Sequence, residues 1–397
     1  MEIRRNAQVV KKLTGGGIGP SLLGSIHKCG DKIKRFVFVR NSSGEAAGPE
    51  MSGGRYFGLD LIRFFAILSV VCVHFLYNIG FDNVIVHGER FFLASVFRGV
   101  VNPCVPLFFM LSGYLMKNKK PVKSYYNKFI RLFVLFLMAG ILSNIFRILA
   151  LGQQMSAKDW LSSFTYFSAV GYGWYLRAYI GLFVLIPFLN IMIHTIKAKR
   201  QYRVLLLSLL LVFSLPTFLN YLGFRFPDHW ANFYPVIYYL LGTYISIYKP
   251  KPRKGLLLAG IVGISILYAS IIFLMKHGQK CEALLFQYGN LIVLFIGVML
   301  FLLLYQVKAP RVHFLCRFVS SVSRVSYSMF LISWIYDRTI YSFLLNPFVP
   351  SFYDRLFFVV LTVPAVFLLS YLSALVLEGG YNFVAAKGKQ LFFKQTV

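Results

Sequence analysis

Acidic side chains are scarce in this chain of 397 residues, which contains 13 Asp and Glu against 42 Lys and Arg and carries a formal net charge of +29. The sequence has no Asp-x-Asp pair. Its His, Asp and Glu residues also lack the short spacings that hold a metal ion. We therefore predict no metal site, and nothing in the sequence indicates a metal-dependent glycosyltransferase.

Cysteine is rare as well, and no two cysteines have the C-x-x-C spacing. The five residues are Cys29, Cys72, Cys104, Cys281 and Cys316. This pattern favours neither a zinc site nor a disulfide framework, so we expect the cysteines to have structural roles. The glycine run at 15–19 is not followed by Gly-Lys-Ser/Thr and is not preceded by a strand, so a phosphate-binding loop is not predicted.

Apolar residues dominate: 58% of the chain is hydrophobic and 18% is aromatic, with only 14% charged. This composition is typical of an all-α polytopic membrane protein. Ten apolar segments are each near the length of a membrane-spanning helix. They cover about 59–80, 99–116, 129–151, 174–196, 204–222, 233–247, 256–275, 288–306, 326–345 and 356–377.

The basic residues lie in short clusters between these segments and do not form one patch, so we expect no nucleic-acid partner. With the N-terminus in the cytoplasm, 31 basic residues fall on the cytoplasmic side and 7 on the other. This bias predicts about ten transmembrane helices, with both termini cytoplasmic, in an inner or plasma membrane. We divide the chain into a flexible basic cytoplasmic segment (1–54), a membrane domain (55–380) and a cytoplasmic tail (381–397).

Two ionisable residues, Arg63 and His74, lie within the first apolar segment. Eleven residues are close to three helical turns, so the two side chains share one helix face about 16 Å apart along the axis. Asp60 precedes Arg63 by three residues, and the two can pair at the cytoplasmic end. We expect His74 near mid-membrane, where it is either a hydrogen-bonded packing residue or a catalytic base, because a neutral imidazole can accept a hydroxyl proton.

Several short motifs follow in a fixed order. The first is Arg63, ten residues and then His74, and the second is VPLFFMLSGY at 105–114. Later ones are KFIR at 128–131, WYLRAY at 174–179 with Pro187, YLLG at 239–242, SYSMFL at 326–331, and Glu378. Over about residues 55–380 this series resembles the membrane acyltransferase-3 family, whose members move acyl groups, commonly acetyl, from coenzyme A to sugars and other small acceptors.

The resemblance implies that His74 is the general base and that Arg63 orients the donor. It also implies contacts to acyl-CoA or the acceptor from a wider set: Asp60, Ser112, Gly113, Lys128, Arg131, Trp174, Tyr175, Tyr179 and Glu378. Acetyl-CoA would be the donor substrate rather than a tightly bound cofactor, and its phosphates suit the cytoplasmic cations. The acceptor would be a hydroxyl of a cell-surface polysaccharide or its lipid-linked precursor, in a protein surrounded by membrane lipid.

Structural roles are the alternative for some of these residues. Ser112 lacks the strand-turn-helix elbow of a serine nucleophile, so we favour close helix packing for Ser112-Gly113. Trp174 and Tyr175 suit anchoring at the outer interface, and Asp337 with Arg338 suits a structural ion pair.

The chain departs from the family at two places. Ser333 stands where a histidine is usual, and Glu378 is followed by two glycines instead of a proline-containing end. The alternative function is a membrane transporter or flippase for a glycan or small solute, although we see no internal repeat of the kind that such proteins often have. A member of the other membrane acyltransferase family with an intramembrane histidine is disfavoured, because its histidine lies late in the chain.

Overall fold

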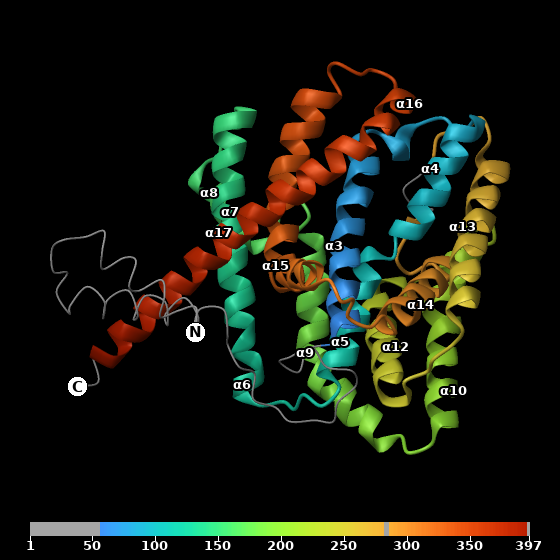
Figure 1. Cartoon of the computed structure of the whole chain (residues 1–397), viewed down its shortest axis with the longest axis horizontal. Coiled ribbons are helices and arrows are strands. Elements are labelled where there is room, and N and C mark those ends of the chain that lie inside the picture. Colours follow the sequence, from blue (N-terminus) through green and yellow to red (C-terminus); the bar gives the residue numbers. More distant parts are fainter. Residues whose placement is uncertain (1–55, 282–285, 395–397) are drawn as a thin grey trace, which may run out of the picture. The chain divides into compact units, whose positions relative to one another are not determined.

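The computed structural model describes residues 56–281 and 286–394, which form helices joined by short connections (Figure 1). The segment predicted at 1–54 lies outside the described residues. Two isolated β-bridges, Ile85 with Lys280 and Val86 with His277, are the only β-structure in the described part. The longer helices are α3 (Phe57–Asn78), α7 (Lys128–Leu151), α9 (Trp174–Thr195), α13 (Lys254–Lys276), α15 (His313–Asp337) and α17 (Val359–Lys394).

Shorter helices and connecting turns complete the described chain. The shorter α-helices are α4 (Gly88–Val101), α5 (Cys104–Met116), α10 (Lys199–Leu209), α11 (Leu215–Tyr221), α12 (Tyr234–Tyr248) and α14 (Leu291–Tyr305). Two π-helical segments are η2 (Leu210–Ser214) and η5 (Arg338–Leu345). The connections contain α6 (Lys123–Tyr126), α8 (Ala157–Thr165), α16 (Phe352–Arg355), η1 (Phe81–Asn83), η3 (Ala231–Phe233) and η6 (Leu356–Phe358).

Each of the ten predicted segments contains a helix. Within the described ranges, seven helical stretches are long and apolar enough to cross a membrane. Helices α12 and α14 each have 15 residues, and α15 is long but contains many serines. The count of about ten crossings and the cytoplasmic position of the termini therefore stay predictions. Helix α17 runs without a break through residue 380, where we expected the tail to begin.

Two other predicted segments differ from the helices that the structure forms there. The second, expected at 99–116, is a pair of helices that breaks at Asn102 and Pro103. Proline has no backbone N–H to continue the first helix, and the Asn102 side chain donates a hydrogen bond to the Phe286 carbonyl oxygen at 2.8 Å. The ninth helix begins at His313 rather than 326, and at Arg338 it changes to a π-helical turn. Such π-turns are often found at functional sites.

Helix α3 lies in the interior of the helical domain. It packs against α4, α5, α14, α15 and α17. In its most apolar window 72% of the residues are buried, against 17% for the stretch at 199–221. The helix that contains Arg63 and His74 is therefore surrounded by protein on most sides.

Helices α5 and α12 cross at two glycines. A Cβ atom on Gly113 would lie 1.9 Å from the Tyr239 carbonyl oxygen, and one on Gly242 would lie 1.9 Å from the Met110 carbonyl oxygen. Thr243 Oγ1 donates a hydrogen bond to the Gly113 carbonyl oxygen at 3.1 Å. The motifs at 105–114 and 239–242 therefore pack against each other, and Gly113 makes the close approach expected of small residues between membrane helices.

Candidate active site

His74 lies on α3 against the side chains of Tyr172 and Asp337. The imidazole stacks on the Tyr172 ring, with centroids 3.5 Å apart and an interplanar angle of 24°. Its Nδ1 is 3.2 Å from Asp337 Oδ2, although Nδ1 meets hydrogen-bond geometry with none of the residues described. The side chain is largely enclosed, since the residue is only 9% exposed.

His74 lies in the last third of α3. Helix α3 ends at Asn78, so His74 is four residues, about one turn, from the end of the helix and not at its middle. Asn78 connects the end of α3 to Tyr172. Its Nδ2 donates hydrogen bonds to the His74 carbonyl oxygen at 2.8 Å and to the Tyr172 hydroxyl at 3.3 Å. His74 therefore lies close to the end of α3 opposite to Arg63.

Asp337 was expected to form a structural ion pair with Arg338, but the structure places its carboxylate beside His74. It is fully buried at the end of α15, and Oδ2 accepts a hydrogen bond from the Tyr172 hydroxyl at 2.8 Å. No ion pair between Asp337 and Arg338 is found among the described residues; Arg338 instead places its guanidinium 5.8 Å from the centre of the Trp334 ring. The one sequence signal for its role was an acidic residue inside a mainly apolar segment, which is a costly position.

Asp60 and Arg63 form a second polar cluster, one that joins α3 to α15. Ser320 and Ser323 each donate a hydrogen bond to one Asp60 carboxylate oxygen, both at 2.7 Å. Arg63 Nη1 is 3.9 Å from Asp60 Oδ1, which is the pairing expected from the spacing of three residues. Asp60 is 2% exposed, so it holds Arg63 and the two helices together from within the protein.

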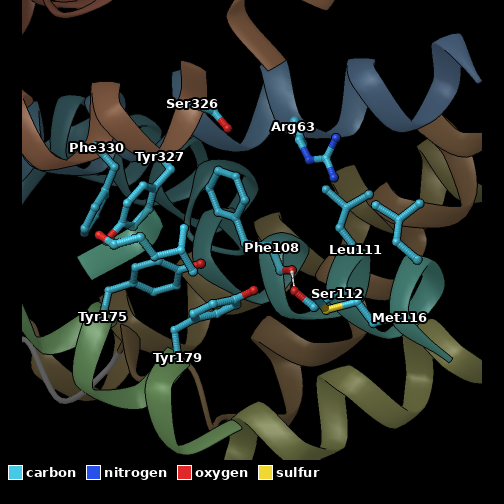
Figure 2. A pocket seen from close by; sticks show the side chains of 12 residues that line it. Arg63, Phe108, Leu111, Ser112, Met116, Tyr175, Tyr179, Ser326, Tyr327 and Phe330 are labelled. Atoms are coloured by element: carbon cyan, nitrogen blue, oxygen red, sulfur yellow. Dashed lines mark hydrogen bonds between the residues drawn. The ribbon is translucent and has the colours of Figure 1, made fainter. Parts of the chain in front are cut away.

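A cavity of about 210 Å³ begins at Arg63 (Figure 2). Its wall is formed by Arg63, Phe108, Leu111, Ser112, Leu115, Met116, Leu132, Tyr175, Tyr179, Ser326, Tyr327 and Phe330. Figure 2 shows the Arg63 guanidinium at one end and the Phe330 ring at the other. The lining is mostly apolar and aromatic with a few polar groups, which is the usual character of a small-molecule site.

Two aromatic rings lie at the inner end of the cavity. His74 is not part of the cavity wall, and the Phe330 ring, which is, lies 6.5 Å from the imidazole between centroids. The Tyr175 ring lies 5.0 Å from that of Phe330. Arg63 and His74 therefore share one helix, but in this conformation only Arg63 faces the cavity.

Three of the other predicted site residues are in the cavity wall: Ser112, Tyr175 and Tyr179. Ser112 Oγ donates a hydrogen bond to the Phe108 carbonyl oxygen at 3.0 Å, within its own helix. Tyr175 is 8% exposed and faces the cavity, so the interfacial anchoring considered for it is not observed. Trp174 is outside the wall and stacks on Tyr288 at 5.5 Å between centroids.

Arg131 and Glu378 form a separate bridge, and Lys128 lies at the start of α7. Arg131 Nη2 donates to Glu378 Oε2 at 2.7 Å, while Ser328 Oγ donates to Glu378 Oε1 at 2.8 Å. These bonds connect α7, α15 and α17. Lys128 is exposed. None of these residues lines the cavity, although Arg131 and Arg63 are on helices that border it.

Comparison with known proteins gives one match. An acyltransferase domain family, acyltransferase-3, matches residues 56–375, which is most of the chain. No curated protein and no solved structure matches it. The match includes α3 with Arg63 and His74, the cavity helices, and α15 with Asp337. With its apolar helices, the chain is a multi-pass membrane protein that belongs to the acyltransferase-3 family.

Proposed function

We propose that this protein, located in a bacterial cytoplasmic membrane, transfers an acetyl group from acetyl-CoA to a hydroxyl group of a cell-surface polysaccharide or its lipid-linked precursor. The observation that carries the proposal is the pairing of His74 with a buried carboxylate, Asp337, next to a cavity that begins at Arg63. Together these supply a base, a group that orients the base, and a cation for the donor.

The donor end of the site is the Arg63 end of the cavity. A guanidinium suits the phosphates of coenzyme A, because its N–H groups can make paired, charge-assisted hydrogen bonds to phosphate oxygens. The apolar and aromatic wall beyond Arg63 suits the uncharged pantetheine arm and the acyl group. Lys128 extends the positive charge of the entry, whereas Arg131 is already paired with Glu378.

The chemical step needs one proton to move twice. His74 Nδ1 faces Asp337, so Nε2 is the nitrogen that takes the proton from the acceptor hydroxyl. The hydroxyl oxygen bonds to the thioester carbonyl carbon, the carbon–sulfur bond breaks, and the imidazolium returns its proton to the departing thiolate. The Asp337 carboxylate stabilises the imidazolium while it exists, and the Tyr172 hydroxyl holds that carboxylate in place.

The Phe330 side chain has to rotate before an acyl group in the cavity can reach His74. Its ring lies at the inner end of the cavity, next to the imidazole. Rotation of an aromatic side chain is a small local motion compared with helix movement. We therefore place the acyl group at Phe330 and the acceptor on the far side of His74, toward the end of α3.

The test is acyl transfer in membranes that contain the intact protein. Acetyl-CoA labelled in the acetyl group is expected to give labelled glycan from which mild alkali releases acetate, as an ester requires. Acetyl-CoA labelled in the coenzyme part should leave the glycan unlabelled, and membranes without the protein are the background. Absence of acetyl label above background with every acyl-CoA and glycan pool tried would contradict the proposal and favour a transporter.

Arg63→Gln should raise the KM for acetyl-CoA by about tenfold or more, because one charge-assisted contact to phosphate is lost. We expect a smaller change in kcat, since Arg63 is distant from His74 along α3. Asp60 keeps its two serine donors in this variant, so the junction of α3 with α15 should hold. Steady-state kinetics at varied acetyl-CoA measure the effect. The matched control is Arg177→Gln, an exposed arginine on α9 outside the cavity wall, and an equal KM change there would refute the assignment.

A further inference from the structure

Two arginines meet at one tryptophan near the His74 end of the domain. The Arg147 guanidinium lies 4.8 Å from the centre of the Trp334 ring, and that of Arg338 lies 5.8 Å from it. Arg147 is four residues from the end of α7, and Arg338 opens the π-helical segment η5. Neither forms an ion pair with any residue in the described ranges.

The hydrogen bonds of Arg147 within the described ranges go to uncharged groups. The two guanidinium groups contact the same Trp334 ring, which brings two like charges near each other. Arg147 donates to neutral acceptors, the Ser168 carbonyl oxygen at 2.8 Å and Asn144 Oδ1 at 3.3 Å. Arg147 is half-buried and Arg338 is exposed, and both lack an ion-pair partner in the described ranges, so together they attract an anion. The planar guanidinium is well matched to the oxygens of a phosphate.

Two segments, the end of α15 and the connection before α9, contact both the arginine pair and His74. Arg338 directly follows Asp337, whose carboxylate faces His74. In the connection before α9, Gly171 packs on the Trp334 ring, where a Cβ would lie 1.9 Å from Cδ1. The next residue, Tyr172, stacks on His74. A ligand held by the two arginines is therefore adjacent to the proposed base.

The surface of α7 around Arg147 is apolar. Five large exposed apolar side chains lie within two turns of it: Ile141, Leu142, Ile145, Ile148 and Leu149. An exposed apolar helix face beside a cationic group fits an amphiphile with a hydrocarbon chain and an anionic group. A soluble anion would use only the arginines, whereas a lipid would use both features.

We infer that Arg147 and Arg338 bind the phosphate of a lipid-linked glycan acceptor, with its hydrocarbon chain along α7 and its sugar directed toward His74. The inference rests on the proposed function, because it specifies the acceptor of that reaction. It selects a lipid-linked phosphate over a finished, uncharged polysaccharide.

Equilibrium binding to the purified full chain tests this without any acyl donor. The probe is a radiolabelled long-chain polyprenyl monophosphate, compared with the matching polyprenol. The intact protein should bind the phosphate at least about tenfold more tightly, as expected for charge-assisted contacts. The variants R147Q and R338Q should each weaken this preference, and the double variant should abolish it. R225Q is the matched control, since Arg225 is exposed in a connection away from these contacts.

Several outcomes would overturn the inference: equal affinity of the intact protein for phosphate and polyprenol, or an unchanged preference in the double variant. Competition by phosphatidylglycerol at equal concentration would indicate a general site for anionic lipids. Competition by inorganic phosphate would indicate that the site binds phosphate without a hydrocarbon chain. Arg338 is exposed, so R338Q keeps the test valid if R147Q fails to fold.

Two different results would contradict the inference and the proposed function. Acetyl transfer to glycan without arginine-dependent phosphate binding would overturn the inference alone. Arginine-dependent phosphate binding without transfer from any acyl-CoA would overturn the proposed function, and the two arginines would then be a phosphate site of another activity.

Discussion

His74→Gln and Asp337→Asn are each expected to lower kcat for acyl transfer by about 10²- to 10⁴-fold, the usual contribution of a positioned general base. Glutamine keeps polarity and approximate size but cannot take up the hydroxyl proton. Asparagine keeps the shape of Asp337 but removes the negative charge that faces His74 Nδ1. Single-turnover transfer of labelled acetyl groups in membranes with equal amounts of each protein measures the loss.

Ser333→Ala is the control for these two variants. Ser333 is buried on α15, one turn before Asp337, and its hydroxyl bonds only to the Phe330 carbonyl oxygen in the described contacts. The family resemblance predicts a histidine at this position, so near-normal activity in this variant would show that position 333 has no proton-transfer role in this protein. Full activity of His74→Gln would instead rule out His74 as the base and agree with a translocation path that needs only polarity.

Gly113→Ala is expected to destabilise the protein by more than about 3 kcal/mol, at the upper end of the usual cost of overpacking. The added methyl group would lie 1.9 Å from the Tyr239 carbonyl oxygen, which belongs to the α12 backbone and cannot rotate away. Helices α5 and α12 would have to separate, and the hydrogen bond from Thr243 to the Gly113 carbonyl oxygen would be lost. Thermal unfolding of the detergent-solubilised protein, followed by size-exclusion chromatography, measures the effect.

Gly263→Ala makes the same chemical change where there is room for it. Gly263 is exposed on α13, and a Cβ there would have no atom within 4 Å. Alanine favours helix over glycine by up to about 1 kcal/mol, so this variant should be unchanged or slightly more stable. A similar loss of stability in both variants would show that glycine itself, rather than the crossing of α5 with α12, is what matters.

The helices were predictable because their cause is local. A run of about twenty apolar residues has to satisfy its backbone hydrogen bonds internally in a membrane, and a helix does so with no partner. The errors fell where a local signal was weak or was misread. Pro103 ends one helix and starts another within a single apolar run, and the serine-rich start of α15 is too polar to be recognised by its hydrophobicity.

Helical spacing predicted the geometry of the candidate site only along α3, whereas Ser112, Tyr175 and Tyr179 of the cavity wall followed from the family resemblance. The spacing of Arg63 and His74 sets their common face and separation, because helical geometry has a fixed period. The pairing of Asp60 with Arg63 followed from the same geometry. The partners of these residues on α15, Ser320 and Ser323, did not, because nothing in the sequence states which face of α15 packs against α3.

The amino-acid sequence alone was enough to predict a helical membrane protein of the acyltransferase-3 family, with His74 as its candidate base. The packing of the helices was needed to show that His74 faces Asp337, that Phe330 of the cavity wall lies beside the imidazole, and that Arg147 and Arg338 share Trp334. The physical reason is that helix formation depends on neighbouring residues, whereas these contacts depend on how helices distant in the sequence pack together.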